Sequence, residues 1–136
     1  MNLMAFSNED PQHKALSEFR LVNGVVQATF RNGKDLPESV AAPLAVLAAD
    51  RWYHLAMSRT LDGIVTLYID GLEVARAQLT VTMRQLQPTD FDRLDLGALY
   101  FASGDAMMRD FFDGYMDDVR LYDYVLTAEE IFALGT

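Results

Sequence analysis

The protein has 136 residues, a net charge of −9 and no cysteine. This length corresponds to one domain over residues 1–136, with enough chain to bury a core without disulfide bonds. The lack of cysteine excludes disulfides, zinc–cysteine sites and thiol catalysis. An acidic surface repels phosphate backbones, which argues against nucleic acid as a partner. The longest apolar stretch, Val40–Ala49, has ten residues and is too short for membrane insertion.

The acidic excess lies in the second half of the chain. Residues 1–60 carry six acids and six bases, whereas residues 61–136 carry fourteen acids and five bases. Such an excess is typical of a solvated face that keeps a protein soluble. A divalent-cation site or a cationic partner is the alternative. The start of the chain lacks a basic region followed by an apolar one, so it shows no signal peptide. We therefore expect either a cytoplasmic protein or part of a longer exported one.

Short β-favouring runs separated by turn residues dominate the sequence. Asn-Gly or Asp-Gly pairs at 23–24, 62–63 and 70–71 stand between such runs. These residues tolerate the positive φ that a two-residue hairpin turn requires. The pattern predicts an all-β sandwich, with a three-stranded antiparallel meander over residues 52–79. The predicted strands are Leu3–Phe6, Glu18–Val22, Val25–Arg31, Leu44–Leu47, Trp52–Thr60, Ile64–Ile69, Leu72–Leu79, Leu94–Tyr100 and Tyr115–Tyr122.

Two segments carry helical signals. Thr127 followed three residues later by Glu130 forms a capping box and predicts one short C-terminal helix. The alanines of Val40–Ala49 suit a helix, but Pro43 and the neighbouring strands suit an extended segment. We favour the extended form.

Three segments occur in the order that characterises a known family. They are Trp52–Ala56, Val65–Val74, which contains Leu-Tyr-Ile-Asp-Gly, and Phe112–Asp123, which is followed by Leu126–Ile131. The pattern resembles the laminin-G-like group of the concanavalin A-like lectin/glucanase superfamily over residues 52–134. The resemblance implies a concanavalin A-like jelly-roll of two antiparallel sheets. It also implies an extracellular or cell-surface location and a glycan or glycoprotein as partner.

The resemblance leaves the beginning of the fold incomplete. Family domains carry several strands before the segment that matches Leu3–Phe6. A jelly-roll without those strands exposes unpaired backbone edges. Three outcomes would relieve this: a longer protein of which the chain is a fragment, a second copy that supplies strands by swapping or edge pairing, or a reduced sandwich. A homo-oligomer formed through an exposed sheet edge is therefore one expectation.

Trp52 and His54 have two interpretations each. Trp52 is either a stacking platform for a sugar ring or a core anchor between the sheets, and its place on a predicted strand favours the anchor. His54 alternates onto the same face. A catalytic or metal-binding role for His54 would need a partner that the sequence does not identify.

Asp117 is the candidate metal ligand. In the alternation of the predicted last strand it shares the inward side with Val119 and Leu121, where an unpaired charge is costly. It resembles the strand aspartate that binds structural calcium in related glucanases. Calcium prefers carboxylate and carbonyl oxygens, so structural Ca²⁺ is the candidate cofactor. Hydrogen bonds from turn N–H groups to Asp117 are the alternative.

Two further acidic regions are candidate ligand sites. Asp90, Asp92 and Asp95 lack the glycine and final glutamate of an EF-hand and predict a solvated loop. The loop from Tyr100 to Phe111 combines aromatic and planar polar side chains, and binding residues concentrate on such loops. Tyr100, Asp105 and Arg109 are therefore the candidate ligand-binding residues.

These observations favour a non-catalytic carbohydrate-binding or adhesion module, part of a larger protein. Glycoside hydrolases of this superfamily carry a Glu-x-Asp-x-Glu type of run, and a retaining mechanism needs two close carboxyl groups. The sequence contains no such run, so we expect no enzyme activity. A protein-interaction or assembly module, completed by strand swapping or edge pairing, is the second interpretation.

Overall fold

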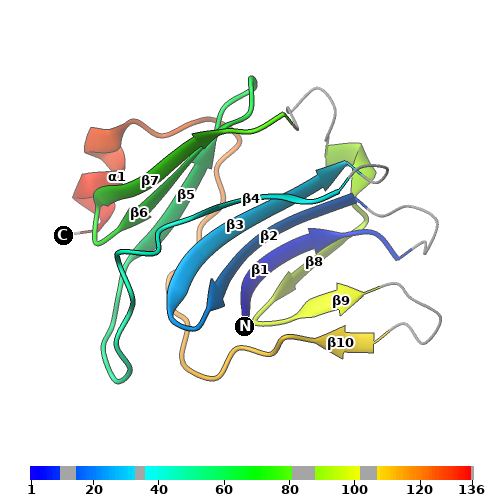
Figure 1. Ribbon diagram of the computed structural model, residues 1–136, viewed down its shortest axis with the longest axis horizontal. Helices are drawn as coiled ribbons and strands as arrows, with labels where there is room; N and C mark the ends of the chain where they lie inside the picture. Colours follow the sequence, from blue (N-terminus) through cyan, green and yellow to red (C-terminus); the bar gives the residue numbers. More distant parts are fainter. Residues whose placement is uncertain (10–14, 33–35, 81–87, 102–106, 136) are drawn as a thin grey trace.

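The computed structural model describes residues 1–9, 15–32, 36–80, 88–101 and 107–135. Its strands pair antiparallel throughout and form sheets in the orders β4-β3-β2-β1-β8, β5-β6-β7 and β10-β9 (Figure 1). The strands are β1 (Asn2–Ser7), β2 (Ala15–Val22), β3 (Val25–Asn32), β4 (Glu38–Ala41), β5 (Leu55–Arg59), β6 (Ile64–Ile69), β7 (Leu72–Gln78), β8 (Arg93–Leu96), β9 (Leu99–Phe101) and β10 (Met107–Arg109). A 3₁₀ turn (Pro88–Asp90) and the helix α1 (Ala128–Leu134) complete the described elements. The predicted sandwich of two antiparallel sheets with one short helix is confirmed.

The Asx-Gly turns behave as their chemistry requires. Asn23 and Gly24 both have positive φ (52° and 78°), as do Asp70 and Gly71 (50° and 81°). Each pair closes a two-residue hairpin. The meander over 52–79 is present as β5-β6-β7. Its first connection differs from the prediction, because Thr60 N–H bonds to Ile64 O at 2.9 Å across a longer loop in which the glycine, Gly63, has the positive φ.

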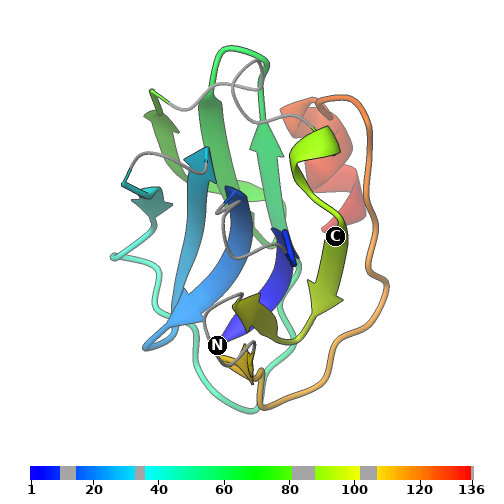
Figure 2. The ribbon, with the colours of Figure 1, turned by 90° about the vertical axis from the view of Figure 1, so that its right-hand side faces the viewer.

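The core lies where the two larger sheets face each other (Figure 2). β6 packs across β3, and β7 packs across β4. Phe30 and Val26 of β3 are buried with Val65 and Leu67 of β6 in one cluster. On the other half of the five-stranded sheet, Leu94 and Leu96 of β8 stay 43% and 50% exposed. The three-stranded sheet therefore covers one half of the inner face and leaves the other half open.

Helix α1 closes the outer side of the three-stranded sheet. Thr127 accepts a hydrogen bond from Glu130 N–H at 3.2 Å and donates its own N–H to the Glu130 carboxylate at 3.1 Å. This is the predicted capping box. Ile131 is buried, and the end of the helix lies against the turn between β6 and β7. A Cβ on Gly135 would lie 2.6 Å from Gly71 N, so this close approach requires glycine.

Some of the predicted strands differ from the structure. Tyr115–Tyr122 is not a strand, although its residues alternate as in one. β propensity marks a segment that is able to pair, but the pairing edge is a tertiary property, and no described residue pairs with it. Leu44–Leu47 is not a strand either, because Ala45 N–H turns back to Ala42 O. Val40–Ala49 contains no helix, and Leu94–Tyr100 is divided at Gly97, whose φ is 74°.

The packing predicts a sharp difference between two leucines of adjacent strands. Leu67→Ala removes a fully buried side chain and should lower the free energy of unfolding by about 2–5 kcal/mol. The matched control, Leu72→Ala, truncates an exposed leucine and should change it by less than about 0.5 kcal/mol. Urea unfolding followed by circular dichroism measures both, and equal losses would contradict the placement of the core.

Candidate functional site

The uncovered half of the sheet forms the floor of a cleft of about 1720 Å³. We call it the open cleft. β5 borders it on one side and residues 115–126 border it on another. Its floor is apolar and is made by Met4, Phe6, Phe19, Leu94 and Leu96. The volume exceeds the roughly 300–1,000 Å³ of most small-molecule pockets, so the cleft suits a chain-like ligand.

Residues 113–126, which we call the rim segment, run from the region of β10 to α1 along the outside of the molecule (Figure 2). They carry many exposed apolar side chains for a segment of this length, and Tyr115 is 87% exposed. Tyr122 and Tyr124 pack edge to face, with ring centroids 5.8 Å apart. Exposed apolar groups that gather beside a cleft mark an interaction surface.

Trp52 lies at the cleft and not in the core. It is 67% exposed, so the expectation of a core anchor is wrong. The physical reason is that β5 begins three residues later, at Leu55, which leaves Trp52 in the preceding loop. Arg51 lies 4.9 Å above the neighbouring Tyr53 ring and 3.7 Å from the Asp70 carboxylate. An exposed indole therefore stands beside planar hydrogen-bonding groups.

His54 joins the same region through its backbone. Its N–H donates to the Asp70 carboxylate at 2.9 Å, and its carbonyl accepts Asp70 N–H at 2.8 Å. The ring nitrogen Nδ1 is buried without a hydrogen-bond partner among the described residues. No group of three or more histidine and carboxylate side chains that could hold a metal occurs in the described part of the chain.

Arg59 is a charged residue in the wall of the open cleft that the sequence analysis missed. Its guanidinium lies 4.4 Å from the centre of the Phe30 ring. Burial lowers the pKa of Arg59 to about 10, because removal from water disfavours the charged form. The alternation of Leu55, Met57 and Arg59 along β5 was the available signal, since it places all three on the inner face.

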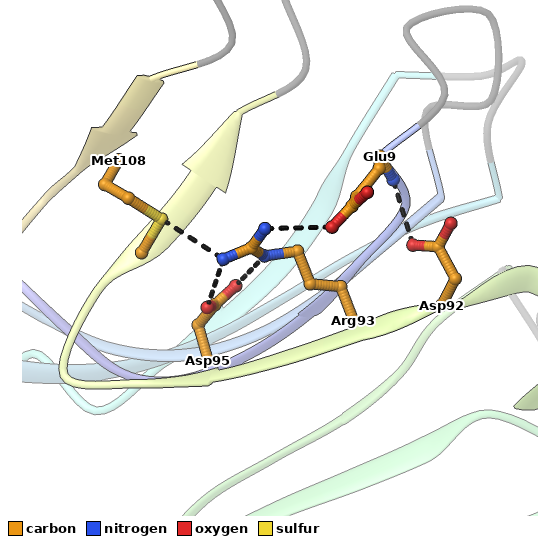
Figure 3. Close-up of polar contacts among 5 residues, drawn as sticks. All are labelled: Glu9, Asp92, Arg93, Asp95 and Met108. Atoms are coloured by element: carbon orange, nitrogen blue, oxygen red, sulfur yellow. Dashed lines mark hydrogen bonds and ion pairs between the residues drawn. The ribbon is translucent and has the colours of Figure 1, made fainter.

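A second polar cluster surrounds Arg93 on β8 (Figure 3). Arg93 forms two parallel hydrogen bonds to Asp95, at 2.8 and 2.9 Å, and a third to Glu9 at 3.0 Å. Its remaining contacts are to Met108 Sδ at 3.6 Å and to the Tyr100 ring, whose centroid is 4.1 Å away. Hydrogen bonding to Asp95 raises the pKa of Arg93. The cluster joins the end of β1, strand β8 and the β9–β10 hairpin.

Two of the predicted ligand-binding residues lie on the β9–β10 hairpin beside this cluster. Tyr100 on β9 is half-buried, with Arg93 against one ring face. Arg109 pairs opposite Leu99 in the same hairpin and is exposed. Asp105 lies outside the described residues. The assignment of a ligand to these three stays a prediction.

The acidic run at 90–95 contributes to this structure instead of forming a solvated loop. The Asp95 side chain is 13% exposed because it pairs with Arg93. Asp92 accepts the Glu9 N–H at 2.9 Å, and the Asp90 carbonyl accepts the Asn8 amide at 3.0 Å. The expectation of a solvated loop is therefore wrong for Asp95.

Asp117 lies on the rim segment and is exposed. Its carboxylate accepts Asp118 N–H at 2.8 Å, which agrees with the alternative of a local backbone donor. Arg120 pairs with Asp118 at 2.8 Å, and this hydrogen bond raises the pKa of Arg120. The expected inward position is wrong, because residues 115–122 form no strand. Calcium binding at Asp117 stays a prediction, which the thermal midpoint with Ca²⁺ and with chelator would test.

Comparison with known proteins identifies the fold family. A laminin-G profile described as the concanavalin A-like lectin/glucanases superfamily matches residues 5–132. The chain belongs to this family. No curated protein is significantly similar to this laminin-G-like chain in sequence.

A solved structure shares the fold of this laminin-G-like chain. It is an S-layer domain-containing protein from Clostridium thermocellum, 19% identical, with a TM-score of 0.55. The likeness covers 100% of this chain, which spans 63% of the S-layer structure. At this identity the likeness shows the fold alone. Among the helices that the structure describes, none is long and apolar enough to cross a membrane.

Arg93 and Arg59 should differ in their contribution to stability. Arg93→Met removes three charge-assisted hydrogen bonds and should lower the free energy of unfolding by about 1–3 kcal/mol. Arg59→Met removes a partly desolvated cation and its contact with the Phe30 ring, and should cost clearly less than the loss of three charge-assisted hydrogen bonds. Urea unfolding of both variants under one buffer condition measures the order, and a larger loss for Arg59→Met would contradict it.

Proposed function

We propose that the protein is a non-catalytic carbohydrate-binding module that uses Trp52 as its stacking platform. The exposed indole at the open cleft carries this proposal. Sugar rings present apolar C–H faces that pack on an aromatic surface, while their hydroxyls need planar hydrogen-bonding groups. Arg51 and Asp70 supply such groups close to Trp52. An aromatic side chain with an apolar body and a polar edge is suited to this kind of contact.

The absence of catalysis is part of the proposal. Glycoside hydrolysis needs two carboxyl groups that flank the scissile bond, and the sequence lacks the Glu-x-Asp-x-Glu run of the family's enzymes. Two of the acids that line the cleft, Asp70 and Asp118, form ion pairs with arginines. Laminin-G-like membership supports a non-catalytic module.

We also propose a cell-surface or extracellular location. The fold neighbour is an S-layer domain-containing protein, and the laminin-G-like family suggests the same setting. The chain spans 63% of that neighbour, so a role within a larger surface protein is part of the proposal.

Trp52 makes the carbohydrate proposal directly testable, because it is the one tryptophan in the sequence. On a printed glycan array the protein should be retained by a subset of glycans. Titration with those glycans should shift the tryptophan emission as the indole leaves water. Trp52→Ala should weaken binding at least about tenfold, which corresponds to about 1.4 kcal/mol.

Leu72→Ala serves as the matched control, since it truncates another exposed apolar side chain away from the cleft. It should bind as the unaltered protein does. The proposal fails if the array retains nothing, or if Trp52→Ala binds as well as the control.

A second candidate function is protein assembly. The open edge of β5, which pairs with β6 alone among the described strands, favours it. A strand edge of this kind accepts an extended segment of another chain through main-chain hydrogen bonds.

A further inference from the structure

The two larger sheets have four outer edges among the described strands, and these edges differ in how well they are protected. β4 and β8 are four residues long and carry Glu38, Arg93 and Asp95. β7 carries a Glu73–Arg76 ion pair at 2.8 Å and has a register irregularity at Val74, opposite Leu67 and Tyr68 of β6. Short length, charge and bulges are the usual protections against edge pairing. β5 has none of these over Leu55–Ser58, and it borders the apolar cleft.

The hydrogen bonds between β5 and β6 fix which backbone groups face this free edge. Asp70 N–H bonds to His54 O at 2.8 Å, and Thr60 N–H bonds to Ile64 O at 2.9 Å. Hydrogen-bonded pairs alternate along an antiparallel ladder, so the even-numbered residues of β5 bond to β6. The N–H and C=O groups of Leu55, Met57 and Arg59 therefore point to the free edge.

The rim segment offers the complementary strand. Asp117–Tyr122 has strand-like alternation, and Val119 and Leu121 are 47% and 57% exposed. Its backbone has no hydrogen bond to another strand in the described part of the chain. Both ends are held, because Phe112 N–H bonds to Gly97 O at 2.8 Å and Thr127 caps α1. Asp118 in its middle has a φ of 53°, so the segment would pair with another chain once Asp118 becomes extended, while its ends stay in place.

We propose that two copies of the protein associate by pairing β5 of each with residues 117–121 of the other, antiparallel, with Arg59 opposite Asp117. This inference rests on the assembly function. The same register places Met57 opposite Val119 and Leu55 opposite Leu121. All three inner pairs then face the open cleft, and Ala56 and Ser58 face outward opposite Arg120 and Asp118. A two-fold axis makes each contact occur twice.

This register matches opposite charges and apolar side chains at the same time. In the extended, paired form Asp117 meets the inward cation of β5, and two apolar pairs follow at the next two inner positions. A shift by one residue would turn every side chain to the opposite face. The rim segment of the same chain does not make this pairing, since no described backbone hydrogen bond joins it to β5.

Sedimentation equilibrium tests the association at about 0.15 M salt, which screens the repulsion between two copies of charge −9. The protein should form a dimer whose fraction rises with concentration. Arg59→Glu and Asp117→Arg should each weaken it at least about tenfold, and the double variant should restore it. Arg76→Glu and Asp62→Arg, with the same charge changes at exposed sites away from the cleft, should leave it unchanged. Circular dichroism confirms that each variant folds.

Cross-linking gives a second readout that does not depend on charge. The chain has no cysteine, and hydrogen-bonded antiparallel neighbours have Cα atoms about 5.5 Å apart, within disulfide range. Mixed Met57→Cys and Val119→Cys proteins should therefore form a covalent heterodimer on oxidation. Mixed Ala56→Cys and Val119→Cys proteins, which present opposite faces, should not.

The outcomes separate this inference from the assembly function on which it rests. Met57→Pro removes an N–H that points to the free edge and leaves the β5–β6 ladder intact. A dimer lost in Met57→Pro but unaffected by both charge variants would keep assembly through β5 and overturn this register. A protein that is monomeric at every concentration would overturn both the assembly function and this register. A disulfide within one chain of the Met57→Cys/Val119→Cys double variant would overturn the dimer too, because it would show that the rim segment pairs with β5 of its own chain.

Discussion

The inner face of the five-stranded sheet is larger than the area that the three-stranded sheet covers. β6 and β7 bury the part made by β3 and β4, where Phe30 and Val26 contact the inner side chains of the second sheet. The part made by β1 and β8 keeps Leu94 and Leu96 in contact with water. Exposed apolar area costs roughly 25 cal/mol per Å², so this half of the sheet is where a ligand or partner gains most by binding. Trp52, Arg59 and the rim segment all line this region.

Arg93 and Arg59 are held in two different ways. Arg93 is surrounded by Asp95 and Glu9, and its ion pairs connect segments that are distant in sequence. Arg59 lies in the cleft wall against the Phe30 ring, where burial lowers its pKa. The first arrangement stabilises the fold as it stands. The second is a charge in a partly apolar wall, where removal from water disfavours the charged form.

The two proposed functions use different parts of one cleft. Trp52 lies in the loop before β5 and offers an aromatic face beside Arg51 and Asp70. β5 offers main-chain donors and acceptors over an apolar floor. A glycan would contact the face of Trp52, and a strand of another chain would contact the edge of β5. Both are consistent with the laminin-G-like fold, which positions loops and strand edges around a sandwich and by itself specifies neither ligand.

The sequence determined the local features of this protein. Asn23-Gly24 and Asp70-Gly71 set their hairpins because positive φ is a property of those residues, and Thr127 with Glu130 set the start of the helix. The family and the antiparallel sandwich also followed from residue order. The alternation of apolar and polar residues predicted most of the strands, although it also predicted strands at Leu44–Leu47 and Tyr115–Tyr122 that the structure does not contain.

The tertiary structure decided what each of these segments contacts. A strand needs a neighbouring edge, and burial needs a covering layer; neither is encoded within the segment itself. Residues 115–122 therefore stayed unpaired, Asp117 became exposed, and Trp52 lay outside the core because β5 began three residues later. The same reason brought Arg93, Asp95 and Glu9 together across 84 residues of chain. It also left the edge of β5 facing the uncovered half of the sheet.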